Sequence, residues 1–242
     1  MTDRPIIFSA SMVKALLEGR KSQTRRVLKL PKRTHSGGPI YERPDMGGWA
    51  ATTIGGGGCF TVGRDGRRLP VPERPAIWHQ TTGVVMALPF DVGDRLWVRE
   101  AFRGSKDYDA CPPREWSHWP VHYEADGAPD PRDEVGENGK LRSPIHMPRW
   151  ASRLTLTVTD VRVERLQEIS EADAQAEGFP ISWDGKPYDP PSPQEDSWQG
   201  YGRSSMSLYW NSLHGPDAWD ANPWICALTF TVSRGNIDGG AA

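Results

Sequence analysis

The sequence predicts an α+β protein built on a small, mixed and partly closed β-barrel with flanking helices. Three observations support this prediction. Apolar and polar residues alternate throughout 153–166, an apolar and aromatic segment at 223–232 closes the ordered part, and expected strands outnumber expected helices. Glycine (25 residues) and proline (22) are concentrated in polar stretches, which indicates long insertions in a single domain spanning 1–242.

The first elements are expected before residue 29. Residues 5–9 predict a short strand, and Ser11 is placed to cap the helix that follows. Gly19 suits the end of this helix, where a left-handed backbone is cheap only for glycine. Residues 21–28 pass from polar to apolar, as in a loop that enters a strand, so several polar side chains follow directly after the helix.

A strand is also expected at 95–99, after a Val-Gly-Asp turn. Alternation places Leu96 and Val98 on one face of it, and Arg95, Trp97 and Arg99 on the other.

The longest strand signal lies at 153–166, where the apolar register shifts near Asp160 and so predicts a bulge or tight turn. A short helix is expected over 169–178, with Ser170 as its cap and Gly178 as its stop.

A second helix over 205–213 and a core strand over 223–232 complete the expected order, and the tail after Ser233 is expected to be frayed. Three polar stretches are interpreted as insertions, of which the first should hold little regular core beyond one irregular hairpin. They span about 31–90, 104–143 and 180–203.

Charge and cysteine content limit the class of protein. The formal charge is −2, from 29 basic and 31 acidic residues, which argues against a protein that coats nucleic acid through phosphate neutralisation. Three widely spaced cysteines give neither a disulfide framework nor a zinc pattern, and the N-terminus lacks the apolar core of a signal peptide. We therefore expect a soluble cytoplasmic protein with no metal and no cofactor.

Taken together, the ordered segments resemble the ASCH domain, a branch of the PUA-like superfamily. The resemblance covers roughly half the chain, and parts of it are similar to phage and prophage members. The resemblance to the family rests on 18–26 (Glu-Gly-Arg-Lys-Ser-Gln-Thr-Arg-Arg), 92–96, 153–166, 176–179 and the final strand. The segments similar to phage and prophage members are 145–153 and 219–224. It implies a PUA-like barrel with a cleft beside the first helix.

Some compact members of this family are amidohydrolases that remove the acetyl group from the exocyclic amine of acetylcytidine. They use a lysine, a threonine and a glutamate. The resemblance places the lysine on Lys21 and the threonine on Thr24, and its best match for the glutamate is Glu177, with Glu171 a weaker one.

The chemistry of amide hydrolysis supports a site made of a lysine, a threonine and a glutamate. A threonine hydroxyl needs a base, and a lysine with a lowered pKa can take its proton. Burial and nearby positive charge both lower a lysine pKa, and the second effect is expected from Arg20, Arg25 and Arg26, which also become candidate substrate-binding residues. Glu177 then either positions the pair and returns a proton, or activates water while Thr24 holds the substrate; the sequence leaves both versions open.

A base-binding site also needs aromatic stacking and hydrogen bonds. Trp97, Arg99 and Glu100 are candidates for this role. The expected partner is a small nucleoside or nucleotide. RNA remains a second possible partner, and no association with a membrane is expected. Two alternatives to hydrolysis remain: a non-catalytic module that binds RNA or a modified nucleotide, and a nuclease or nucleic-acid-modification accessory of phage origin.

Overall fold

The computed structural model describes residues 2–40, 47–116, 120–127, 138–178 and 201–239. Over these residues the chain is a mixed α+β protein with strands predominating, as the sequence predicts. The described residues contain no helix that is long and apolar enough to cross a membrane.

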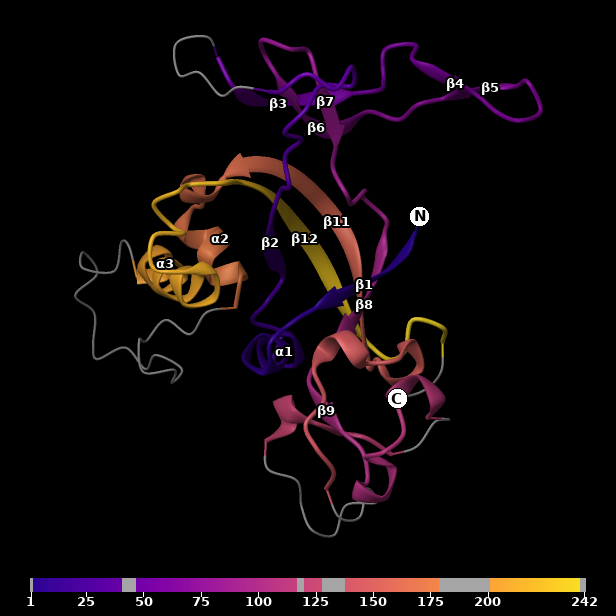
Figure 1. The fold of residues 1–242 in the computed structure, drawn as a ribbon, viewed down its shortest axis with the longest axis vertical. Coiled ribbons are helices and arrows are strands. Elements are labelled where there is room, and N and C mark those ends of the chain that lie inside the picture. The colour runs from indigo at the N-terminus through magenta and orange to yellow at the C-terminus, as the bar shows by residue number, and fades with distance from the viewer. Residues whose placement is uncertain (1, 41–46, 117–119, 128–137, 179–200, 240–242) are drawn as a thin grey trace.

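A mixed five-stranded sheet forms the centre of the molecule (Figure 1). Its first pair, β1 and β8, is parallel, and the other neighbours are antiparallel. In spatial order the strands are β1 (Asp3–Ile7), β8 (Arg95–Arg99), β11 (Leu154–Arg165), β12 (Trp224–Arg234) and β2 (Gln23–Val27).

Alternation along these strands builds the main core. Leu96 and Val98 of β8 are buried, together with Leu154 and Leu156 of β11, as the period of two predicts. The predicted irregularity in β11 is confirmed, because its register with β12 shifts between Val158 and Asp160. One extra residue at this point moves the later apolar side chains back onto the core face.

Helix α1 (Ala10–Leu17) connects β1 to β2 and buries Met12, Val13, Ala15 and Leu16. The predicted cap at Ser11 is wrong: Ser9 occupies the cap position, and its side chain makes no capping hydrogen bond. Gly19 has a φ of +74°, which confirms the left-handed end of this helix.

Helices α2 (Glu171–Ala176) and α3 (Tyr201–His214) cover one face of the sheet, on the side of β11 and β12 (Figure 1). The Ser170 hydroxyl accepts a hydrogen bond from the backbone N–H of Asp173, as predicted. Helix α3 starts earlier than the expected 205–213, inside the third predicted insertion; of that insertion only 201–203 lies within the described residues.

The expectation of little regular structure in 31–90 is wrong. This segment holds a three-stranded antiparallel sheet and a separate hairpin. The sheet consists of β3 (Trp49–Ile54), β6 (Arg74–His79) and β7 (Val85–Ala87), and the hairpin of β4 (Phe60–Val62) and β5 (Arg68–Pro70). Buried Trp49, Ile77 and Val84 belong to the same apolar cluster as the central sheet. Their pairing depends on partners far apart in the sequence, which a local glycine-rich pattern does not reveal.

The described part of 104–143 is largely turns and short 3-10 helices. Its short strand β10 (His122–Tyr123) pairs with β9 (Phe102–Arg103), and Arg142 and Asn138 form isolated bridges to Phe102 and Ser105. It packs around its own small cluster, which contains Phe102, Trp116 and Met147. The 3-10 helices are η1 (Lys106–Tyr108), η2 (Pro113–Glu115) and η3 (Glu124–Asp126) here, and η4 (Pro144–His146), η5 (Arg149–Ala151) and η6 (Leu166–Glu168) further along.

The segment after Ser233 is held rather than frayed, which corrects another expectation. The Asn236 side-chain amide donates to the backbone oxygens of Arg149, Trp150 and Ser152, and Ile237 is buried. These contacts fix the described part of the tail, up to residue 239, against the approach to β11.

Candidate functional site

The segment that follows α1 is fixed by backbone hydrogen bonds on both sides. The N–H groups of Arg20 and Lys21 donate to the oxygen of Ala15, which completes the helix end. Ser22 then donates to the oxygen of Ala176 in α2 and accepts from the N–H of Phe230 in β12. Residues 20–22 are thereby held between α1, α2 and the sheet.

Lys21 and Glu177 form a buried ion pair across this junction. Lys21 Nζ lies 2.6 Å from Glu177 Oε2 and 2.7 Å from the backbone oxygen of Glu177. Lys21 and Glu177 are only 2% and 4% exposed, although they lie 156 residues apart in the chain. The structure therefore brings together two of the three residues that the resemblance places in the site.

Gly178 makes this approach sterically feasible. Its φ is +86°, and a Cβ at this position would lie 2.7 Å from Lys21 Cβ and 2.9 Å from Ala15 Cβ. Any larger residue would push α2 away from the lysine. The glycine that the sequence marked as a helix stop thus also sets the distance between Lys21 and α2.

The pKa of Lys21 is lowered from its ordinary value. Burial is the largest cause, and the positive charges of Arg26 and Arg25 act in the same direction. The negative charge of Glu177 and its hydrogen bond oppose this shift without reversing it. The expected direction is found, with Arg25 and Arg26 among its causes.

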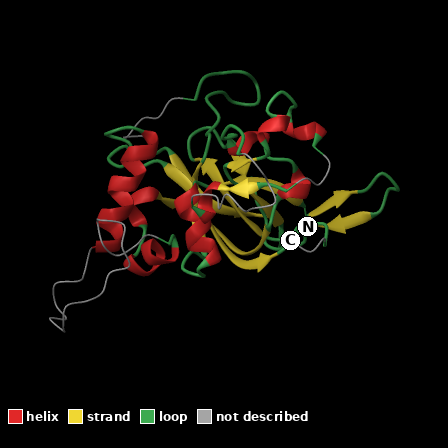
Figure 2. Cartoon of the chain, turned by 90° about the horizontal axis from the view of Figure 1, so that it is seen from below, coloured by secondary structure: helices red, strands yellow, loops and turns green. Residues whose placement is uncertain are grey.

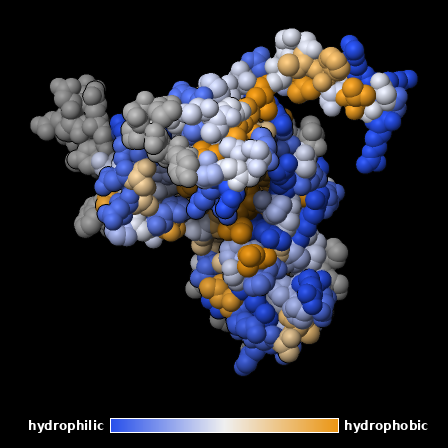
Figure 3. All heavy atoms as spheres, turned by 45° about the horizontal axis from the view of Figure 1, so that its top comes forward, coloured by the Kyte–Doolittle hydropathy of each residue, from blue (hydrophilic) through white to orange (hydrophobic). Residues whose placement is uncertain are grey.

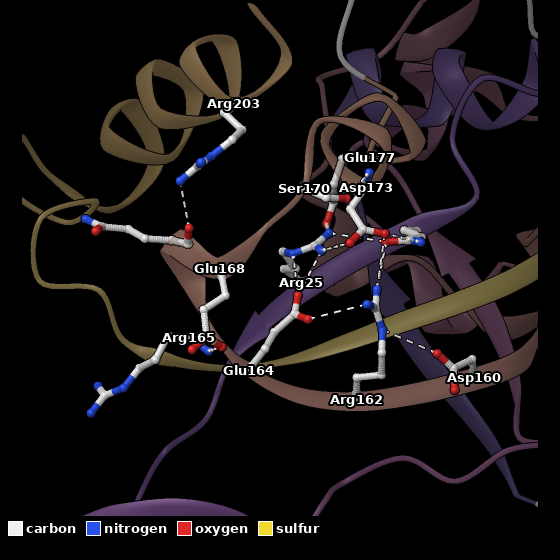
Figure 4. A network of polar contacts seen from close by, with 12 residues as sticks. Arg25, Asp160, Arg162, Glu164, Arg165, Glu168, Ser170, Asp173, Glu177 and Arg203 are labelled. Atoms are coloured by element: carbon white, nitrogen blue, oxygen red, sulfur yellow. Dashed lines mark hydrogen bonds and ion pairs between the residues drawn. The ribbon is translucent and has the colours of Figure 1, made fainter. Parts of the chain in front are cut away.

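Arg25 holds the other oxygen of the Glu177 carboxylate. Its Nη1 lies 3.1 Å from Glu177 Oε1, and its Nη2 lies 2.8 Å from Glu164 Oε1 and 3.4 Å from Asp173 Oδ2. The Arg25 side chain is fully buried, so three carboxylates around one guanidinium compensate its charge (Figure 4).

The same network extends to two further side chains. Arg162 Nη2 donates to Asp173 Oδ1 at 3.2 Å, and Gln23 Nε2 donates to the same oxygen at 2.8 Å. Because Asp173 belongs to α2 and the other two residues to strands, the network fixes α2, and with it Glu177, against the sheet.

Thr24 lies on the opposite face of β2 from Arg25. Its register partner is Leu228, which belongs to the main core, and Thr24 itself is 4% exposed. Among the described residues, Lys21 Nζ donates to Glu177 and not to Thr24, whose hydroxyl has no hydrogen-bond partner there. Thr24 is therefore buried and lies three residues after Lys21 in the sequence. The structure shows no direct contact between Thr24 and the Lys21–Glu177 pair.

Arg26 shares the Thr24 face of β2 and lies over the same aromatic ring as Lys21. The Arg26 guanidinium lies 5.1 Å from the centre of the Phe8 ring, and Lys21 Nζ lies 5.4 Å from the same centre. Burial lowers the pKa of Arg26, whereas the charges of Glu177 and Tyr209 act against this. Two cations, one carboxylate and one aromatic ring thus meet at the end of β1.

Arg20 lies at the rim of this group. Its side chain pairs with Glu18 and donates from Nη1 to the backbone oxygen of Gly178 at 2.8 Å. It therefore ties the loop to the end of α2, and its charge is not among the causes of the Lys21 pKa shift.

Trp97 and Arg99 do not join this group. The structure confirms that they share a face of β8, but β11 and β12 separate β8 from β2 within the sheet. Thr24 pairs with Leu228 of β12, and Val232, four residues further along β12, lies on the same face. Val232 pairs with Leu156, which in turn pairs with Leu96, so Leu96 shares the Thr24 face. Trp97 and Arg99 therefore lie on the face opposite Thr24. The Arg99 guanidinium instead lies 4.5 Å from the Trp97 ring centre.

Glu100 also belongs to another cluster. Its carboxylate accepts two hydrogen bonds from Arg153, at 2.9 and 3.0 Å. Burial raises the pKa of Glu100, although the Arg153 interactions oppose that shift. Glu171, the weaker match for the glutamate, accepts from the N–H of Gly202 and so links α2 to α3.

Sequence reasoning missed several members of the site. They are Phe8, Glu164, Asp173 and Tyr209. Asp173 had one usable signal, because it lies four residues before Glu177 and therefore on the same side of a helix. The others come from distant segments and carry no local pattern.

The site is thus a buried polar centre of the lysine–glutamate type, mounted on the edge of a mixed sheet. The described residues contain no cluster of three or more His, Cys, Asp or Glu side chains that could hold a metal ion. Comparison with protein-family models, with curated proteins and with solved structures gave no match.

Proposed function

We propose that this chain is an ASCH-type amidohydrolase that removes an acyl group from the exocyclic amine of an N4-acylated cytidine nucleoside or base. The observation that carries the proposal is the buried contact of 2.6 Å between Lys21 and Glu177. A lysine kept at low solvent exposure with a lowered pKa suits a general base. Burying this charge costs stability, which favours a functional reason for keeping it.

In the proposed reaction, neutral Lys21 takes the hydroxyl proton of Thr24 as the Thr24 oxygen attacks the acyl carbon. The bond between that carbon and the exocyclic nitrogen then breaks, and the proton passes to the leaving amine. Water subsequently hydrolyses the acyl-threonine to release the free acid. In the second version Glu177 activates the water directly and Thr24 only holds the substrate.

The proposal includes a partly closed, PUA-like barrel and a reducing, cytoplasmic setting. The closing contact would lie between the edge strands β1 and β2, where Arg26 Nη2 donates to the backbone oxygen of Ile7 at 2.6 Å. All three cysteines are free, with Cys226 buried and Cys59 exposed, which suits a reducing compartment.

One observation favours a non-catalytic alternative. Within the described residues, Lys21 directs its two hydrogen bonds at Glu177 rather than at Thr24. An ion pair satisfied in this way could serve a module that only binds a modified nucleotide, with Arg26 and Phe8 contacting the base.

Incubation with N4-acetylcytidine, followed by chromatography, tests the hydrolase directly. The wild type should release cytidine, and Thr24→Val should abolish release while leaving the apolar contacts of β2 intact. Thr229→Val is the matched control, since Thr229 lies on neighbouring β12 at the Gln23 register position, on the opposite face. Tight binding of acetylcytidine without turnover would establish the binding module instead.

A further inference from the structure

Residues 60–70 form a hairpin arm that extends away from the rest of the molecule (Figures 1 and 2). The arm consists of β4 and β5 and the turn between them, and every residue of both strands is exposed. A two-stranded hairpin has little stability of its own in water. An exposed arm of this kind contributes little to the stability of the fold, which suggests a role in binding.

The tip of the arm presents positive charge from an ordered turn. The N–H of Gly63 donates to the oxygen of Arg67 at 2.8 Å, and that of Gly66 to Gly63 at 2.9 Å. Arg64 and Arg67 lie in this turn, and Arg68 follows it at the start of β5. Asp65 is the single acidic residue of the arm, in a chain whose formal charge is −2. The arm is thus locally basic on a slightly acidic protein.

The arm also carries a flat stacking surface. The Arg68 guanidinium lies 4.2 Å from the centre of the Phe60 ring. Phe60 pairs with Pro70 and Val62 with Arg68, so all four side chains share one face of the hairpin. Phe60 is 47% exposed and Val62 61%, and Figure 3 shows hydrophobic residues next to the hydrophilic tip.

We propose that the arm binds a single-stranded nucleic acid. The three arginines would contact phosphates, and the exposed Phe60 with its stacked Arg68 would accept an unstacked base. A duplex would satisfy the arginines but not the ring, because its bases are already stacked. This inference does not depend on the hydrolase activity proposed above.

A second copy of the chain fits the arm less well. A tip-to-tip contact between two arms would bring their arginines together, and like charges repel. The exposed apolar side chains, Phe60, Val62 and Leu69, are also too few for a stable interface between protein chains. A phosphate backbone, by contrast, complements the charge of the tip.

Fluorescence anisotropy with labelled single-stranded RNA and DNA of mixed sequence tests the proposal on the full chain. In the variant Arg64→Ala/Arg67→Ala/Arg68→Ala, the dissociation constant should rise about tenfold or more. The slope of log affinity against log salt should become shallower by about 2, since roughly 0.7 counterions are released for each single-strand phosphate contact.

The control removes three positive charges elsewhere, in Lys14→Ala/Arg114→Ala/Lys140→Ala, all at exposed positions. This variant should bind as the wild type does. Phe60→Ala should weaken binding to the single strand without changing the salt slope. Because all of these residues are exposed, the melting temperatures should stay close to that of the wild type.

The proposal is overturned if the wild type does not bind the oligonucleotides, if it prefers duplex to single strand, or if arm and control variants lose affinity equally. Hydrolysis of acetylcytidine, a small nucleoside, should be the same in the arm variant and the wild type. Loss of oligonucleotide binding with intact hydrolysis, or the reverse, therefore separates this inference from the proposed reaction.

Discussion

Glu177 is the residue on which the site depends, because each of its carboxylate oxygens faces a different buried cation. Oε2 accepts from Lys21 and Oε1 from Arg25. The first interaction raises the lysine pKa against the effect of burial, and the second fixes the orientation of the carboxylate. The glutamate thus controls both the charge and the geometry of the proposed base.

Replacing Glu177 by Gln should move the pH dependence of hydrolysis. Without the carboxylate, the pKa of Lys21 falls further, so the acid limb of the kcat/KM profile should shift to lower pH. Unfolding should become easier by about 3 kcal/mol, because the buried ammonium loses its partner. Glu171→Gln, in the same helix, serves as the control for both measurements. An acid limb that moves to higher pH would refute the role of Lys21 as the base.

Lys21 should also leave a signature in stability. Its folded-state pKa lies below the ordinary 10.5, so between these two values the unfolded chain binds more protons than the folded one. The cost of burying the ammonium is therefore fully present below the folded pKa and is relieved as pH rises. In urea titrations at rising pH up to the ordinary lysine pKa of 10.5, the free energy of unfolding of the wild type should rise relative to Lys21→Met. A difference that stays constant or falls contradicts the lowered pKa.

At the scale of elements, α1 and α2 approach each other through Gly178. Gly178→Ala combines a left-handed backbone with two Cβ contacts below 3 Å, whereas Gly19→Ala has the same kind of backbone and open space. We expect a cost of about 1 kcal/mol for Gly19→Ala and about 3 kcal/mol for Gly178→Ala, measured by chemical unfolding. Equal losses of unfolding free energy in the two variants would mean that the close approach of α2 to Lys21 does not contribute to stability.

The three-stranded sheet of β3, β6 and β7 should be part of the main fold and not a loosely attached insertion. Ile77 is fully buried in the main apolar cluster, so Ile77→Ala should cost about 2–5 kcal/mol of unfolding free energy. Val85→Ala, at an exposed position of the same sheet, should change stability far less. If both variants unfold like the wild type, this segment does not share the core.

The sequence was informative about most elements that a local pattern determines, although it placed the cap of α1 at Ser11 instead of Ser9. Alternation located β8 and β11, the register shift near Asp160 located the bulge, and Gly19 and Gly178 located two helix ends. Where pairing joins distant segments, as in β3 with β6, the local pattern was uninformative and the expectation failed. The separation of Trp97 from Lys21 could not be read from the sequence for the same reason, because strand order is a property of the whole sheet.

At the scale of the whole molecule, the proposed site exists only when the fold is complete. Lys21 follows the first helix, Glu177 ends the second, and Thr24 lies on an edge strand held by β12. The sequence could nominate these residues through their resemblance to a family. Only the fold, however, shows that Lys21 meets Glu177, and that Glu164 and Asp173 hold Arg25 behind it.

The most direct test of the central claim is a double-mutant cycle on acetylcytidine hydrolysis. If Lys21 and Thr24 act as one unit, Lys21→Ala and Thr24→Val should each reduce kcat/KM by about a thousandfold or more, and the double variant should lose little beyond either. Full activity in either single variant, or losses that simply multiply in the double variant, would contradict a shared role for these two side chains.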